Sequence, residues 1–354
     1  MSRFFSSRFD ALTPYTPGEQ PRDSQYIKLN TNESPYDTSP LSAALAAKEA
    51  LSLRLYSDPE CTDLVREAAS YFGVDTDEIL FTNGSDEALV FAVMAFCDAS
   101  TGAVFPDITY GFYPVICSLN GIAYEEIPLN EDLTVPLDAF YQTGKTVFLA
   151  NPNAPTGIAL SCGEIETVLQ NNPDNVVIVD EAYVDFGTES MVPMIRKYDN
   201  LLVIQTMSKS RSLAGGRLGF AIGNRELIRD LNTLKYSTNP YNINRMTMAA
   251  GIGALRDDAL IRENCRKICA VREKTANALD ALGFLMTPSK ANFLFVRHPS
   301  LSGETIYRKL KERGILVRYF NKPRLTEYVR ITVGTAEQME ALLDALQEIL
   351  EEEV

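Results

Sequence analysis

The stretch LLVIQTMSKSRSLAGGRLGF, residues 201–220, changes character within a few positions. It opens with the apolar run 201–204, which is typical of a buried β-strand. Lys209 then stands between two serines, and Arg217 follows a pair of glycines. In a parallel sheet that is covered on both faces, ligands bind beyond the carboxyl ends of the strands. We therefore expect a ligand site where this strand ends.

The same pattern recurs along the middle of the chain. Short apolar runs alternate with helical patterns and end, in order, at Phe81, Phe105, Ala150, Asp180, Thr206 and Gly223. This alternation predicts an α/β fold with a mostly parallel central sheet and helices on both of its faces. The strands and helices predicted over 291–353 indicate a smaller α+β domain. We expect an N-terminal arm at 1–25, a small α+β domain formed by 26–45 and 261–354, and a large α/β domain at 46–260.

The composition argues against several classes of protein. A net charge of −14 over 354 residues is unfavourable for a nucleic-acid partner, because neutralising phosphates requires an excess of Lys and Arg. No apolar run approaches the ~18 residues that a membrane helix needs, and residues 1–10 lack the apolar core of a secretory signal. Six dispersed cysteines without a CxxC pair fit a reducing cytoplasm and argue against a metal site. Because His298 is the only histidine, we expect Lys, Tyr, Asp or Glu to carry acid–base chemistry.

Two residues at strand ends have reactive side chains. Lys209 could form a Schiff base if burial lowered the pKa of its amine, and the alternative is a solvated lysine in a turn. Asp180 ends the apolar run VVIVD, so its carboxylate needs a cationic partner or several hydrogen-bond donors if it is buried. The alternative for Asp180 is a cap on the next turn.

Another strand end offers an anion site. Gly84 and Ser85 precede a predicted helix, whose free N–H groups and dipole could bind a phosphate, although Ser85 could equally be an N-cap. Asp86 would repel that anion unless its side chain points away. Arg217 could reach the same anion, because the glycines before it allow a close approach, or it could lie on the surface.

Two tyrosines could contact a flat ligand. Tyr110 could stack on a ring, and Tyr183 could donate a hydrogen bond to a ring oxygen, or both could belong to the core. An amine, a carboxylate, a phosphate site and a stacking ring together describe one cofactor, pyridoxal 5′-phosphate (PLP).

These residues lie in motifs that span nearly the whole chain. The motifs are LTPY (12–15), LNTNESP (29–35), LYSDPE (55–60), TNGSDEAL (82–89), PDITYGFY (106–113), NPNAPTG (151–157), VDEAYVDF (179–186), TMSKSRSLAGGRLGF (206–220) and VRITVGT (329–335). In this order they resemble the fold-type I PLP-dependent aminotransferases and, within them, the histidinol-phosphate aminotransferase family. The resemblance implies that the large domain binds PLP.

The resemblance also implies a role for each matching residue. Lys209 would bind the cofactor covalently through its amine and, once released, move a proton between the substrate Cα and the cofactor. Asp180 would pair with the pyridine nitrogen, Tyr183 would hydrogen-bond the phenolic oxygen, and Tyr110 would stack on the ring. The phosphate would be held by Gly84, Ser85, Asp86 (through its backbone N–H), Ser208 and Arg217.

Further residues would complete the site. Tyr56 would reach the phosphate in the neighbouring subunit, so a homodimer is expected. The substrate would contact Tyr15, Asn32, Arg318 and Arg330, with Arg330 binding the carboxylate of the amino donor. The family usually has Asn at the position of Ala154, where it donates to the ring oxygen. Here either Asn153 takes over this role or Tyr183 acts alone.

The implied activity is a transamination in histidine biosynthesis, in which L-histidinol phosphate and 2-oxoglutarate give imidazole-acetol phosphate and L-glutamate. The expected partners are these small molecules, and the expected location is the cytoplasm. An aromatic amino acid aminotransferase and a PLP-dependent threonine-phosphate decarboxylase remain as alternatives, because both would use Lys209 and Asp180. A non-catalytic regulator is disfavoured because the chain has no basic DNA-binding segment, and an oxidoreductase because no GxGxxG follows a strand.

Overall fold

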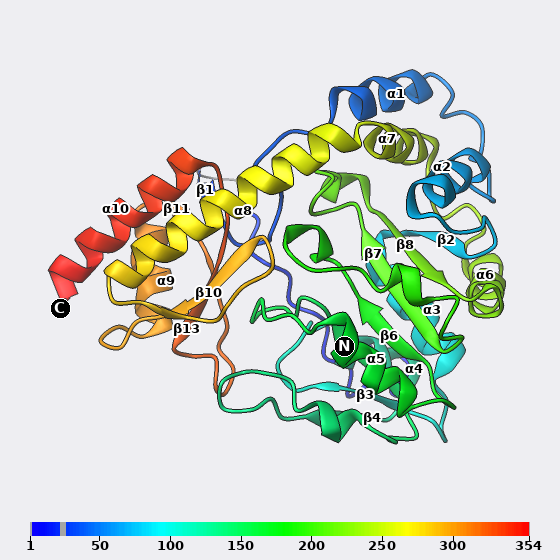
Figure 1. Cartoon of the computed structure of the whole chain (residues 1–354), viewed down its shortest axis with the longest axis horizontal. Helices are drawn as coiled ribbons and strands as arrows, with labels where there is room; N and C mark the ends of the chain where they lie inside the picture. Colours follow the sequence, from blue (N-terminus) through cyan, green and yellow to red (C-terminus); the bar gives the residue numbers. More distant parts are fainter. Residues whose placement is uncertain (1, 22–25, 354) are drawn as a thin grey trace.

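The computed structural model describes residues 2–21 and 26–353. Its largest element is a central sheet of seven strands (Figure 1). The strand order is β2-β8-β7-β6-β5-β3-β4, and β8 alone runs antiparallel to its neighbours. The bounds are β2 Ile79–Asn83, β3 Ala103–Pro106, β4 Tyr124–Ile127, β5 Thr146–Ala150, β6 Val177–Asp180, β7 Leu201–Thr206 and β8 Leu218–Gly223. The expected mostly parallel α/β sheet is therefore confirmed.

Both faces of this sheet are covered by helices, as expected. Side chains alternate along each strand, so Val177 and Val203 enter one core cluster whereas Ile178 and Leu202 enter the other. The first cluster packs against helices α2 (Thr62–Phe72), α5 (Cys162–Gln170) and α7 (Arg245–Arg256). The second packs against α3 (Gly84–Phe96), α4 (Tyr113–Asn120) and α6 (Arg225–Thr238). Burial on both faces explains why the central strands read as continuous apolar runs.

A smaller set of elements forms the other part of the molecule. Its antiparallel sheet has the order β12-β13-β10-β9, with bounds β9 Leu285–Met286, β10 Phe293–Arg297, β12 Arg318–Tyr319 and β13 Tyr328–Thr332. Helices α9 (Gly303–Glu312) and α10 (Ala336–Glu353) lie beside it, and α8 (Asp258–Ala281) runs from here to the large sheet (Figure 1). The short 3-10 helices are η1 Ser7–Phe9, η2 Leu137–Phe140, η3 Val184–Phe186, η4 Val192–Met194 and η5 Ala214–Gly216.

A segment near the N-terminus joins the smaller part. Strand β1 (Ile27–Lys28) pairs in parallel with β11 (Ile315–Leu316). The run ILVRYF reads as one strand in the sequence, but it is divided between two sheets, because β11 pairs with β1 whereas β12 pairs with β13. The sequence did not predict β4. This edge strand has no continuous apolar run, because its first three residues are exposed.

The domain boundaries remain a proposal. Helix α1 (Pro40–Ala50) packs on α7, and the Ser42 hydroxyl donates to the carbonyl of Ala250 at 2.9 Å. We therefore propose the division described above with one change, which assigns residues 40–45 to the large domain. Residues 1, 22–25 and 354 of the expected arm and small domain lie outside the described residues.

The topology brings several loop starts to one edge of the large sheet. The carboxyl ends of β2, β3, β5, β6 and β7 point the same way, because β8 is the single strand of opposite direction. The amino end of β8 lies at this same edge, which places Arg217 there, directly before the strand. Over the part of the chain that the structure describes, we find no helix with the length and apolarity to cross a membrane.

Candidate active site

A cavity of about 780 Å³ lies at this edge of the sheet, where residues from the arm and from both sheets meet. Most of the expected site residues line it, namely Tyr15, Asn32, Ser85, Asp86, Tyr110, Asp180, Tyr183, Ser208, Lys209, Arg217, Arg318 and Arg330. Tyr56, Gly84 and Asn153 are outside its wall. A second cavity, of about 750 Å³, lies between α2, β2 and α6 and contains none of the expected residues.

Lys209 projects into the cavity from the loop after β7. Its amine donates a hydrogen bond to the backbone carbonyl of Thr31 at 3.1 Å and lies 5.9 Å from the centre of the Tyr183 ring. Burial, and next the nearby Arg330 guanidinium, lower the pKa of the Lys209 amine to about 8. A larger fraction of this amine is therefore neutral, and so nucleophilic, at neutral pH than for an exposed lysine.

Asp180 is the last residue of β6 and is 4% exposed. Its carboxylate accepts a hydrogen bond from the Tyr113 hydroxyl at 2.9 Å and another from the Ala182 N–H at 3.2 Å. Burial raises the pKa of Asp180 to about 6. Both donors are neutral, so a cationic ligand atom in the cavity would supply the countercharge that a buried carboxylate needs.

Tyr113 is a site residue that the sequence reading missed. It is fully buried in the first turn of α4 and anchors Asp180. One signal was available: Tyr113 belongs to the same motif, PDITYGFY (106–113), as the expected site residue Tyr110.

The N-terminus of α3 forms a cradle for an anion. Two glycines allow the close packing at this position. A Cβ at Gly219 would lie 2.3 Å from the backbone nitrogen of Ser85, and one at Gly84 would lie 2.5 Å from the Arg217 guanidinium. The free N–H groups of the first helical turn and the helix dipole favour a phosphate at this position. Asp86 does not oppose this, because Arg217 at 2.9 Å and the Tyr110 hydroxyl at 2.9 Å hold its carboxylate.

The opposite wall is basic. Arg330 lies between the rings of Phe293 and Phe320, 5.3 Å and 5.6 Å from their centres. It donates to the carbonyl of Asn30 at 3.0 Å, and its Nε is buried without a partner. Among the ion pairs of the described residues, none includes Arg330. A buried cation in this state favours an anionic ligand.

The arm contributes to the same wall. Arg318 donates to the carbonyls of Thr16 and Pro17 at 3.1 Å and 3.2 Å. The Tyr15 ring packs edge-on against Tyr110, with 6.0 Å between the ring centres. The arm therefore forms part of the cavity wall beside Arg318.

Asn153 and Tyr183, the two candidates for the contact with the phenolic oxygen, differ in whether their hydrogen-bond donors are already used within the protein. The Asn153 amide nitrogen donates to the Ile108 carbonyl and the Thr156 hydroxyl at 2.9 Å and 3.0 Å, and its oxygen accepts from Thr109 at 2.7 Å. Asn153 thus braces its own loop, and Ala154 occupies the cavity wall in its place.

Tyr183 is free to act on a ligand. Its hydroxyl oxygen accepts from the Asn32 amide at 2.9 Å, which leaves the hydroxyl proton to donate into the cavity. Of the two alternatives, the geometry favours Tyr183 acting alone.

Tyr56 lies on the surface. It is 79% exposed and stacks on Tyr241, with 4.6 Å between the ring centres. This position is separate from the cavity of its own chain.

The donors present fit PLP. The amine of Lys209 suits its aldehyde, the carboxylate of Asp180 its pyridinium nitrogen, and the cradle beside Gly219 its phosphate. Across residues 2–21 and 26–353, no group of three or more His, Cys, Asp or Glu side chains is placed to hold a metal ion.

Comparison with known proteins agrees with this chemistry. The family model of aminotransferase class I and II matches residues 24–346. The histidinol-phosphate aminotransferase of Brachyspira hyodysenteriae is 47% identical, with 99% of each chain covered, and that of Marinomonas sp. is 49% identical, with 98% of this chain and 99% of that one covered. The crystal structure of histidinol-phosphate aminotransferase from Sinorhizobium meliloti in complex with PLP has the same fold, with a TM-score of 0.90, 23% identity and 99% of each chain covered. The chain therefore belongs to the class I and II aminotransferase family, within its group of histidinol-phosphate aminotransferases.

Proposed function

We propose that this protein is a PLP-dependent aminotransferase that converts L-histidinol phosphate and 2-oxoglutarate into imidazole-acetol phosphate and L-glutamate. One observation carries the proposal: a single cavity combines Lys209 and Asp180 at adjacent strand ends with the uncompensated cation of Arg330. The full-length similarity to histidinol-phosphate aminotransferases supports the choice of substrate.

The residues of the large domain would bind the cofactor and move the proton. When bound, PLP supplies an electron sink for the bond that breaks at the substrate Cα. Asp180, positioned by Tyr113, would keep the pyridine nitrogen protonated, and the Tyr183 hydroxyl, which accepts from Asn32, would donate to the phenolic oxygen. Tyr110 would cover the ring, and Ser208, Arg217 and the first N–H groups of α3 would bind the phosphate. The neutral amine of Lys209 would take the proton from the substrate Cα and deliver it to the cofactor.

The residues of the opposite wall would bind substrate. The two half-reactions present different anions, because the amino alcohol carries a phosphate where glutamate carries carboxylates. Arg330 has a free Nε for a bidentate contact with either anion. Tyr15, Asn32 and Arg318 lie around it and would exclude water together with the arm.

The substrate can be identified by spectroscopy of the purified protein with PLP. We expect L-histidinol phosphate and L-glutamate each to remove the visible absorbance band of the lysine-bound cofactor within seconds, and 2-oxoglutarate to restore it. Rapid loss with L-phenylalanine alone would instead identify an aromatic amino acid aminotransferase. Loss with L-threonine phosphate and release of carbon dioxide would identify a decarboxylase. The absence of any band after addition of PLP would contradict the cofactor itself.

We also propose that the protein works as a homodimer in the cytoplasm. The free cysteines of the described chain fit a reducing compartment. Tyr56, exposed and stacked on Tyr241, would reach the cofactor phosphate of the other subunit.

Mixed dimers test the reach of Tyr56. We expect Tyr56→Phe to weaken PLP binding by about five- to tenfold, the equivalent of one lost hydrogen bond. A mixed dimer of Tyr56→Phe with Lys209→Ala should contain one site with wild-type affinity, because that site takes Lys209 from one chain and Tyr56 from the other. PLP titration of the purified mixed dimer measures this, and a working site that keeps the Tyr56→Phe defect would place Tyr56 in its own chain's site.

A further inference from the structure

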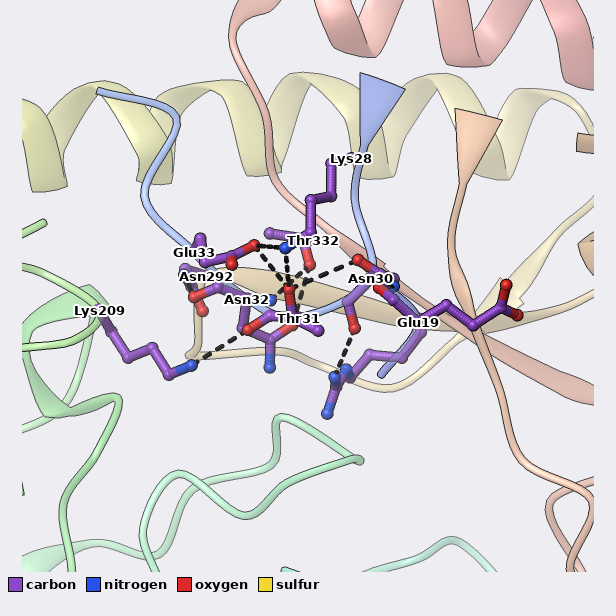
Figure 2. Close-up of polar contacts among 10 residues, drawn as sticks. Glu19, Lys28, Asn30, Thr31, Asn32, Glu33, Lys209, Asn292 and Thr332 are labelled. Atoms are coloured by element: carbon purple, nitrogen blue, oxygen red, sulfur yellow. Dashed lines mark hydrogen bonds and ion pairs between the residues drawn. The ribbon is translucent and has the colours of Figure 1, made fainter. Parts of the chain in front are cut away.

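The segment Asn30–Glu33 connects the reactive lysine to the ion pair between Glu33, at the cavity wall, and Lys28 (Figure 2). The Lys28 amine pairs with the Glu33 carboxylate and donates to the Thr31 hydroxyl at 2.6 Å. The Thr31 hydroxyl in turn donates to Glu33 at 2.6 Å. Glu33 also lines the cavity, and its contacts with Lys28 and Thr31 hold its carboxylate in place. None of the cofactor or substrate roles described above uses Glu33.

The backbone of this segment is fixed from several sides. Its successive carbonyls at Asn30, Thr31 and Asn32 accept hydrogen bonds from three different side chains: Arg330 at 3.0 Å, Lys209 at 3.1 Å and Asn292 at 3.0 Å. The Asn32 N–H donates to the Thr332 hydroxyl at 3.0 Å (Figure 2). The Thr31 carbonyl is therefore a rigid acceptor for the lysine amine.

The charges around Lys209 are unequally compensated. On the large-domain side, Arg217 lowers the pKa of the amine and Asp86 raises it, but these two form an ion pair and largely offset each other. Asp180 also faces the amine, and the ring of Tyr183 lies beside it.

On the other wall, Arg330 lowers the pKa of Lys209 and has no carboxylate partner among the ion pairs of the described chain. Glu33 is the carboxylate on this wall that raises it, with Lys28 behind as its own countercharge. Arg211, two residues after Lys209 in the chain, faces Asp185 and Asp258.

We propose that Glu33 is a positioning residue for Lys209: through Thr31 it fixes the carbonyl on which the free amine docks, and its charge stabilises the amine after the amine has taken up a proton. Lys28 sets how strongly this charge acts. The inference deepens the proposed function, because it rests on Lys209 as the residue that binds the cofactor and moves the proton.

The hydrogen bond between the Lys209 amine and the Thr31 carbonyl affects where the amine lies during proton transfer. Once its amine is free of the cofactor, Lys209 would be held by the Thr31 carbonyl rather than moving through the cavity. A proton taken from the substrate Cα creates an ammonium beside Arg330, which is unfavourable. The carboxylate of Glu33 reduces this cost without contacting the substrate.

The protonation of Lys209 can be measured in the full-length protein freed of cofactor. The rate at which 1-fluoro-2,4-dinitrobenzene labels Lys209, followed by peptide mass spectrometry across a pH range, reports the pKa of the amine. Glu33→Gln removes a negative charge, so the midpoint should fall by about half a pH unit or more. Lys28→Met leaves Glu33 without its countercharge, so the midpoint should rise. Glu19→Gln is the matched control, because Glu19 pairs with Lys311 instead and should leave the midpoint unchanged.

The opposite signs separate this role from structural damage, which would not raise the midpoint in one variant and lower it in the other. An unchanged or raised midpoint in Glu33→Gln overturns the proposal. If Glu33→Gln does not fold, as judged by circular dichroism, the test rests on Lys28→Met. An unchanged or lowered midpoint in Lys28→Met then overturns the proposal. Addition of PLP should protect Lys209 from the label in the wild-type protein. Absence of protection would refute the proposed function, whereas protection without the two shifts would refute the role of Glu33 alone.

Discussion

Replacement of Lys209 by alanine should lower kcat by at least about 10⁴-fold, because it removes both the nucleophile and the acid–base group from the cavity. The variant should also lose the visible absorbance band that arises when PLP binds covalently to the lysine. The fold should persist, since the amine makes one hydrogen bond, to the Thr31 carbonyl, and fills no core cluster.

Steady-state kinetics and absorbance spectra of Lys209→Ala check this expectation. Lys48→Ala is the matched control, because Lys48 is an exposed lysine on α1 that does not line the cavity, and it should change neither measurement. A variant without Lys209 that still carried a covalently bound, reactive cofactor would assign the nucleophile to another residue.

The sequence was most informative where one residue's position in the chain determines its position in the fold. Lys209 and Asp180 could be predicted because each ends or follows a continuous apolar run, and such runs are buried parallel strands whose carboxyl ends share one edge. Arg217 was placed at the correct edge, although the reason, that β8 runs antiparallel, comes from the structure.

What the sequence reading missed depends on contacts between distant segments. Tyr113 supports Asp180 from a helix 67 positions away, and Thr31 meets Lys209 across 178 positions. Neither pairing leaves a periodic signal. The choice between Asn153 taking over the ring-oxygen contact and Tyr183 acting alone is of the same kind, because it depends on whether the Asn153 amide is already satisfied by Ile108, Thr109 and Thr156.

Replacement of Asp180 by asparagine should lower kcat/KM by about two hundred- to five thousandfold, which corresponds to the ~3–5 kcal/mol lost when one partner of a buried ion pair is removed. Asparagine keeps the shape of the side chain and can still accept a hydrogen bond from Tyr113, so the loss would come from the charge. Glu181→Gln is the matched control. Glu181 is also buried, but its carboxylate accepts from Ser190, Met191 and Gln205, and it does not line the cavity.

The pH dependence of PLP binding separates charge from shape at Asp180. Burial raises the pKa of this carboxyl to about 6 in the cofactor-free protein, so below that pH it is mostly neutral and must lose a proton before it can pair with the pyridinium nitrogen. The affinity of the wild-type protein for PLP should therefore fall as the pH drops through about 6. Asparagine does not titrate, so in Asp180→Asn this fall should disappear while the affinity is low throughout. If equilibrium titrations gave parallel pH profiles for the two proteins, the carboxylate of Asp180 would not be the group that pairs with the cofactor nitrogen.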